Sequence, residues 1–141
     1  MSRRLTLTGI ATAIALSASA ALAHDEVALA EAPPPAPYAQ VSELVSLPEF
    51  IPGLGTLYVD PNTLPAGPFL GYDRDGRLAA TIYMTPMADL RNGASFDELA
   101  VGAHHVASVD VYYNAGHPGV EEPHAHVVLY HADDARARLG E

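Results

Sequence analysis

The chain of 141 residues contains no cysteine, no tryptophan and no lysine. Without cysteine it cannot form disulfides, thiolate metal sites or a lipoprotein anchor, and it cannot use a Cys nucleophile. The chain has seven arginines and 17 aspartates and glutamates, so the formal net charge is −10. Such a surface repels nucleic acid and anionic lipid, and neither is an expected partner. Stability must therefore come from a hydrophobic core, from oligomerisation or from a bound ion.

The first 23 residues have the order of an export signal. Arg3 and Arg4 precede a run of Leu, Ile, Ala, Gly, Ser and Thr that ends in Ala21-Leu22-Ala23. A charged start, an apolar middle and a small-residue exit are typical of a signal peptide that is cleaved, here residues 1–23. A membrane anchor is the alternative, because residues 5–23 are almost long enough to span a bilayer. Export predicts a periplasmic or secreted protein that leaves the membrane after cleavage, by the general or the twin-arginine route.

Residues 24–40 are rich in proline, alanine and acidic side chains, with prolines at 33, 34, 35 and 37. This composition predicts an extended linker that packs poorly. Residues 41–141 are then expected to form one small α+β domain, in which an antiparallel sheet carries a few short helices.

Several elements of that domain can be placed from local signals. A short turn of helix is expected within residues 41–55, followed by a strand at 56–59. Residues 69–72 and 77–85 are extended runs on either side of the turn at 73–76, where Gly76 can adopt a positive φ. Thr85-Pro86 and Gly93 mark the start and end of one helix, and Ser95 with Glu98 fits a capping box for another.

The C-terminal part predicts a second hairpin, from residues 104–114 and 124–131. In each strand the more apolar face is assigned to the core. That assignment buries Ala107, Val109, Val111, Tyr113, Ala125, Val127, Leu129 and His131. The opposite face carries Ser108, Asp110, Tyr112, His124, His126, Val128 and Tyr130, with His104 nearby.

Four of the seven histidines lie between His117 and His131. Facing residues of an antiparallel pair share a face, so an even-sum register brings the polar faces together. One such register sets Asp110 opposite His126 and Tyr112 opposite His124. Two imidazoles and a carboxylate could then hold a divalent zinc, iron or copper ion. His117 or Glu121, from the loop over that end, would complete the ligand shell. His131 points the other way and is expected to be structural.

Two other functions stay open at this point. One is a metal-dependent enzyme of oxygenase or hydrolase type that acts on a small substrate. The other is a non-enzymatic envelope protein, a homo-oligomer, whose histidines lie at subunit contacts. An H-x-H pair alone is weak evidence for metal, because histidine is also common on the solvated face of a strand.

The segment "LPAGPFLGYDRDGRLAATIYMTPMADL" and the signature "YYNAGHPGVEEPHAHVVLYH" resemble a small family of exported bacterial domains of unknown function. The likeness covers about residues 59–131 and implies a compact α+β domain, but no catalytic residue. "HAHVVLYH" is also similar to the first metal motif of cupins, with His131 in place of the expected glutamate. Only ten residues follow His131, so the second cupin motif has no room.

Overall fold

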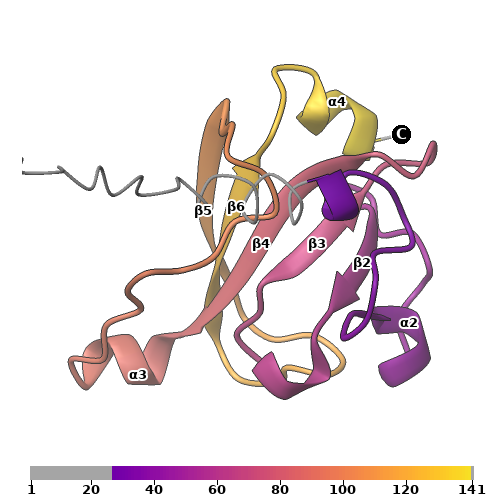
Figure 1. Ribbon diagram of the computed structural model, residues 1–141. Coiled ribbons are helices and arrows are strands. Elements are labelled where there is room, and N and C mark those ends of the chain that lie inside the picture. The colour runs from indigo at the N-terminus through magenta and orange to yellow at the C-terminus, as the bar shows by residue number, and fades with distance from the viewer. Residues whose placement is uncertain (1–26, 141) are drawn as a thin grey trace, which may run out of the picture.

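A computed structural model describes residues 27–140, which form a six-stranded antiparallel sheet with short helices (Figure 1). The order of the strands is β1-β2-β3-β4-β6-β5. The predicted α+β class is therefore confirmed. The predicted signal peptide, residues 1–23, lies outside the described residues. The strands are β1 (Ala39–Gln40), β2 (Thr56–Val59), β3 (Phe69–Tyr72), β4 (Leu78–Pro86), β5 (Ser108–Asn114) and β6 (His124–Tyr130).

The helices within residues 39–140 are all brief: α2 (Val41–Leu44), a 3₁₀ turn η1 (Pro61–Thr63), α3 (Met87–Arg91) and α4 (Ala135–Gly140). The predicted helix after Pro86 is present as α3. The helix predicted from Ser95 does not form within the described chain, because the Ser95 hydroxyl donates to Asp97 Oδ2 at 2.6 Å instead of capping a first turn. Helix α4 was not predicted. Among residues 27–140, no helix has the length and hydropathy needed to cross a bilayer.

The turn between β3 and β4 is built as its sequence predicts. Gly76 has a φ of 77°. The Asp73 carboxylate accepts hydrogen bonds from the amides of Asp75 and Arg77, at 3.0 and 2.9 Å. It also forms ion pairs with the guanidinium groups of Arg77 and Arg138, so helix α4 is tied to this turn. Burial alone would raise the pKa of Asp73, but these bonds and charges outweigh it and lower the pKa.

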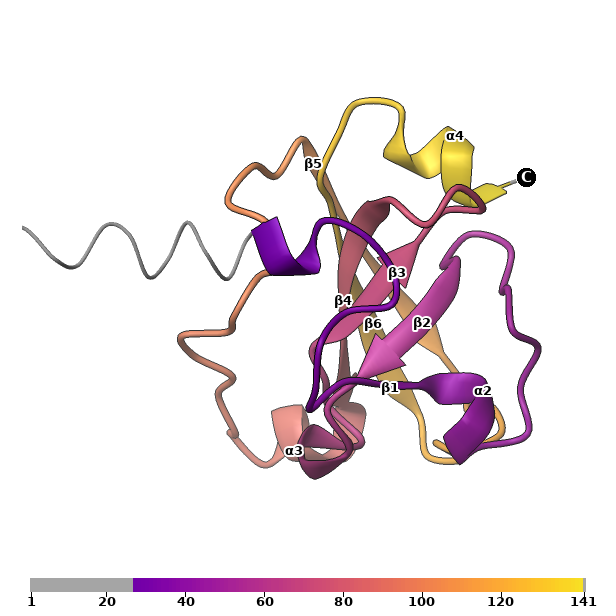
Figure 2. The same cartoon turned by 45° about the vertical axis from the view of Figure 1, so that its right-hand side comes forward.

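One face of the sheet forms the main core. Val59, Phe69, Ile82 and Val128 lie on this face, one from each of four strands, and pack in a single cluster with Leu139 of α4. Figure 2 shows α2 and α4 on this side of the sheet. Helix α2 contributes Val41 to the same cluster. Burial of these apolar side chains holds the short helices in place, because helices of this length are not stable alone.

On strands β2, β3 and β4 the opposite face is covered by the N-terminal segment and by residues 92–107. The Tyr72 hydroxyl donates to the Leu29 carbonyl at 2.8 Å, and the Ala32 amide donates to the Gly76 carbonyl at 2.8 Å. On the other segment, the Gly102 amide donates to Thr81 Oγ1 at 2.8 Å. Residues 27–40 therefore pack against the domain, which differs from the linker predicted for residues 24–40. The prolines do not prevent this segment from packing on the sheet, and its last two residues pair with β2 as strand β1.

Candidate metal centre

The hairpin β5–β6 has a different register from the predicted one. Tyr112 lies opposite His126, Asn114 opposite His124, and Asp110 opposite Val128. The register has an even sum, as expected, but it is shifted by two residues, so the prediction that paired Asp110 with His126 was wrong. Parity limits the register to steps of two and cannot choose among them.

The face predicted to be the core was also wrong. His124 and His126 are 0% and 3% exposed, whereas Val109, Val111 and Tyr113 are 50%, 67% and 62% exposed. The reason is the position of β6 in the sheet, because its other neighbour is β4. Met84 of β4 lies opposite His126 and belongs to the core cluster. The histidines lie on the same face of the sheet and are buried beside it.

Asp110 is engaged elsewhere. Its two carboxylate oxygens lie 2.8 and 2.7 Å from the guanidinium nitrogens of Arg136, and the Tyr130 hydroxyl donates to the carboxylate at 3.4 Å. The predicted His104 is also outside the histidine cluster. It lines a different cavity, of about 420 Å³, between the N-terminal segment and residues 100–104. Neither residue belongs to the group of side chains that could hold a metal.

His117 reaches the other two histidines through a tight turn. The His117 amide donates to the Val120 carbonyl at 2.9 Å, and the Val120 amide donates back to the His117 carbonyl at 3.0 Å. Pro118 and Gly119 form the turn, and Gly119 has a φ of 91°. Proline followed by glycine is the preferred sequence of a turn with a positive φ at its third position. The "HPGV" sequence thus explains why this loop places His117 beside "HAH" of β6.

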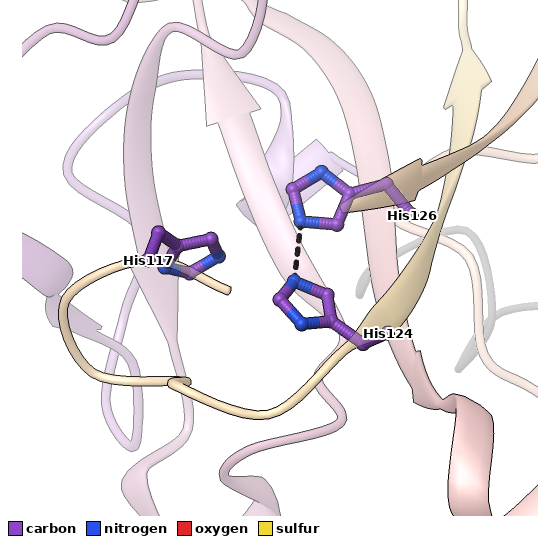
Figure 3. Close-up of side chains that lie close together, drawn as sticks. All are labelled: His117, His124 and His126. Atoms are coloured by element: carbon purple, nitrogen blue, oxygen red, sulfur yellow. Dashed lines mark hydrogen bonds between the residues drawn. The ribbon is translucent and has the colours of Figure 1, made fainter. Parts of the chain in front are cut away.

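The three imidazole rings lie close together (Figure 3). One nitrogen from each of His117, His124 and His126 can be chosen so that all three lie within 4.8 Å of one another. His124 Nε2 and His126 Nε2 are 3.0 Å apart. The His117 ring centroid lies 4.9 Å from that of His124 and 5.7 Å from that of His126. A tetrahedral zinc ion with Zn–N bonds of about 2.0–2.1 Å needs nitrogens about 3.3 Å apart. Small ring movements would reach that geometry.

The outer nitrogens of the three rings all have oxygen partners. His124 Nδ1 lies 2.7 Å from the Glu122 carbonyl oxygen, and His117 Nδ1 lies 3.0 Å from the Pro118 carbonyl oxygen. Because a carbonyl only accepts, both Nδ1 atoms carry the proton in these contacts and both Nε2 atoms keep a lone pair. His126 Nδ1 lies 3.0 Å from the Tyr112 hydroxyl. Metal-binding histidines commonly have this pattern, in which a hydrogen bond at one nitrogen directs the other to the ion.

Tyr112 differs from the carbonyl partners because a hydroxyl can both donate and accept. Without a metal, Tyr112 can donate to His126 Nδ1, and His126 Nε2 then donates to His124 Nε2. With a metal, His126 can hold its proton on Nδ1 and donate it to Tyr112. The cluster can therefore switch between the two arrangements by moving one proton within His126, and its net charge stays the same.

Burial keeps the His126 ring neutral. Together with the smaller effects of the neighbouring His124 and His117 rings, burial lowers the pKa of this side chain from 6.5 to about 4. A neutral imidazole is the form that binds a metal ion, so at pH 7 His126 needs to lose no proton.

His131 is a useful contrast to these three. It is also buried, and its ring nitrogens lie 2.7 Å from Thr81 Oγ1 and 2.7 Å from the His105 carbonyl oxygen. It does not belong to the metal-binding group of side chains among residues 27–140. These contacts are those of a structural histidine, whose ring is satisfied by hydroxyl and carbonyl groups.

A cavity of about 290 Å³ adjoins the cluster. His117 and His126 form part of its lining, together with Tyr112 and Asn114. The rest of its wall is apolar and comes from the segment 41–57 and from β2, β3 and β4: Val41, Leu47, Ile51, Pro52, Gly53, Leu54, Leu57, Phe69, Ile82 and Met84.

One solved structure relates the chain to a known protein. The crystal structure of hypothetical protein TTHB210 from Thermus thermophilus is 43% identical in sequence, with a TM-score of 0.58. The match covers 67% of this chain and 89% of that one. The chain belongs to the TTHB210 family. TTHB210 is described as a hypothetical protein, which agrees with the expected resemblance to proteins of unknown function and brings no activity with it. No protein-family model matches the chain, and a comparison with functionally curated proteins gives no match.

Proposed function

We propose that this protein binds one divalent transition-metal ion through the Nε2 atoms of His117, His124 and His126. The observation that supports this most strongly is the convergence of three buried or half-buried imidazoles whose outer nitrogens are all hydrogen-bonded to oxygen. Packing alone gives little reason to place three imidazoles together, because each buried polar ring costs free energy unless it is paired. His131 illustrates the purely structural alternative, because its ring nitrogens are hydrogen-bonded to a hydroxyl and a carbonyl group and to no other imidazole.

The donor set favours zinc or copper over iron. Three neutral imidazoles form the ligand set of catalytic zinc sites, in which a water molecule takes the fourth position. Non-haem iron in oxygenases uses two histidines and a carboxylate. Asp110, the carboxylate predicted for that role, is bound to Arg136. If the ion is catalytic, it acts as a Lewis acid or activates water, so hydrolase-type chemistry suits the site better than oxygenase chemistry.

Metal analysis tests this proposal. Protein purified without a histidine tag and incubated with zinc should retain one equivalent after gel filtration. His117→Ala and His126→Ala should each lose it, and His131→Ala should keep it. His117 is the mildest site to change because it lies in a half-buried loop. Equal zinc content in all four proteins, or none in the folded wild type, contradicts the proposal.

A second candidate function is self-association of an exported protein, favoured by the apolar outer face of the β5–β6 hairpin. Val109, Val111 and Tyr113 are exposed on β5, which is an edge strand. Their neighbours across the ladder are Leu129, Val127 and Ala125, so the apolar surface is continuous. The proposed partner is a second copy of the chain. In such a dimer the two β5 edges would pair, and the apolar β5–β6 face of each copy would be covered. Light scattering should show a wild-type oligomer and a Val111→Glu monomer; a wild-type monomer contradicts it.

A further inference from the structure

The cavity beside the histidines has a wall without charge. The described residues that line it include no Asp, Glu or Arg. Its polar side chains are Tyr112, Asn114, His117 and His126, and two of them, Tyr112 and His117, lie directly beside His126. The rest of the wall is formed by aliphatic side chains, Phe69 and Met84. A molecule that fits this cavity has an apolar body and one polar group, because a second polar group would be buried without a partner.

The proposed metal decides what that polar group is. Three neutral imidazoles bring no negative charge to the ion, so a divalent metal keeps its full charge of +2 beside an apolar wall. A charge in such surroundings is costly unless an opposite charge compensates it. None of the carboxylates among residues 27–140 belongs to the metal-binding group. An anionic fourth ligand supplies a compensating charge directly at the ion, which a water molecule does not.

Resting on the metal site proposed above, we propose that this cavity binds a small monocarboxylate with an apolar body. One carboxylate oxygen ligates the ion between His117 and His126, and the body packs among Leu47, Leu57 and Ile82. The ligand class is an aromatic or short aliphatic carboxylic acid.

Two polar side chains of the lining can bind the second carboxylate oxygen. In the metal-bound arrangement His126 donates to the Tyr112 oxygen, which leaves the hydroxyl proton of Tyr112 free to donate to the ligand. Asn114 Oδ1 accepts a hydrogen bond from the Gly116 amide at 2.9 Å, so the amino group of Asn114 is the end that can donate. A carboxylate that receives these bonds is held in one orientation.

The volume of the cavity limits the apolar body. A cavity of about 150 Å³ lined by aliphatic side chains holds benzene. The cavity here, at about 290 Å³, accommodates one aromatic ring together with a carboxylate. Benzoate is therefore a suitable probe, acetate supplies the head without the body, and benzyl alcohol supplies the body without the charge.

The test uses the cobalt-loaded full chain, because four-coordinate Co²⁺ has visible absorption bands that report a change of ligand. Titration with benzoate should shift these bands, with a dissociation constant at least tenfold lower than those of acetate and benzyl alcohol. Leu47→Phe, which fills the cavity, should weaken benzoate binding by more than tenfold and leave acetate unchanged. Leu90→Phe makes the same change on α3, outside the cavity, and should behave like wild type.

The outcomes separate this inference from the metal site on which it rests. If cobalt binds but benzoate binds no better than acetate, the ligand inference is overturned and the metal site stands. If Leu47→Phe and Leu90→Phe bind benzoate equally well, the carboxylate is bound outside the cavity, which also overturns it. If cobalt does not bind to the folded protein, both proposals fail.

Discussion

Zinc at 100 times its dissociation constant should raise the melting temperature of this protein by about 12 °C. A ligand that binds only the folded state stabilises it by RT ln(1 + [L]/Kd), about 2.7 kcal/mol at this excess. A folded domain of about 110 residues has an unfolding entropy of about 0.23 kcal/mol per degree. The ratio of these two quantities gives the expected shift.

Differential scanning fluorimetry with increasing zinc measures this shift, and the chain supplies a matched pair of variants. His126→Gln and His131→Gln each remove one buried ring with two hydrogen-bond partners. Both should lower the melting temperature without zinc. Only His126→Gln should lose the response to zinc, because only His126 is a proposed ligand. Both variants keep six histidines, so zinc binding by the unfolded chain is the same in the two. An equal response in the two variants would refute the three-histidine site.

Three further predictions concern single contacts. Tyr112→Phe removes the partner of His126 Nδ1 and should raise the zinc dissociation constant about tenfold in calorimetry; unchanged affinity would show that the hydroxyl does not orient the ring. Asp73→Asn breaks the buried pair with Arg138 and should lower the free energy of unfolding at pH 7 by about 3 kcal/mol in urea titrations. In the wild type this contribution is lost only in strong acid, below pH 3.8, because the folded pKa of Asp73 is depressed. An unchanged free energy of unfolding in Asp73→Asn would mean that the pair is not stabilising. Metal-free wild type should also lose stability as the pH falls from about 6.5 to 4, because the pKa of His126 is near 6.5 when unfolded and near 4 when folded. His126→Gln should flatten that part of the profile, and an identical slope in the variant would contradict it.

Local signals in the sequence were enough to place several strands. The predicted ranges 56–59 and 69–72 are those of β2 and β3, and the predicted turn with Gly76 joins β3 to β4. These elements depend on neighbours in the chain, such as the positive φ of Gly76 and the alternation of apolar residues. The capping box at Ser95 failed because its side chain found a closer partner in Asp97.

The three histidines of the candidate site were among the predicted residues, whereas the predicted Asp110 and His104 lie outside it. His117, His124 and His126 come together because the "HPGV" turn and the two-residue spacing of β6 are both local features. The position of Asp110 depends on the register of β5, which the alternation of faces cannot fix. The buried face of β6 depends on Met84 and Ile82 of the neighbouring β4, a contact between segments about 40 residues apart. Such long-range pairings are set by the whole fold.

The central claim is that one metal ion lies between His117, His124 and His126. Crystals grown with zinc and measured on either side of the zinc absorption edge test it most directly. The account predicts a single strong anomalous peak about 2.0–2.1 Å from Nε2 of each of the three rings. A structure with zinc in the crystal but no peak among these rings, and His124 still hydrogen-bonded to His126, would contradict it.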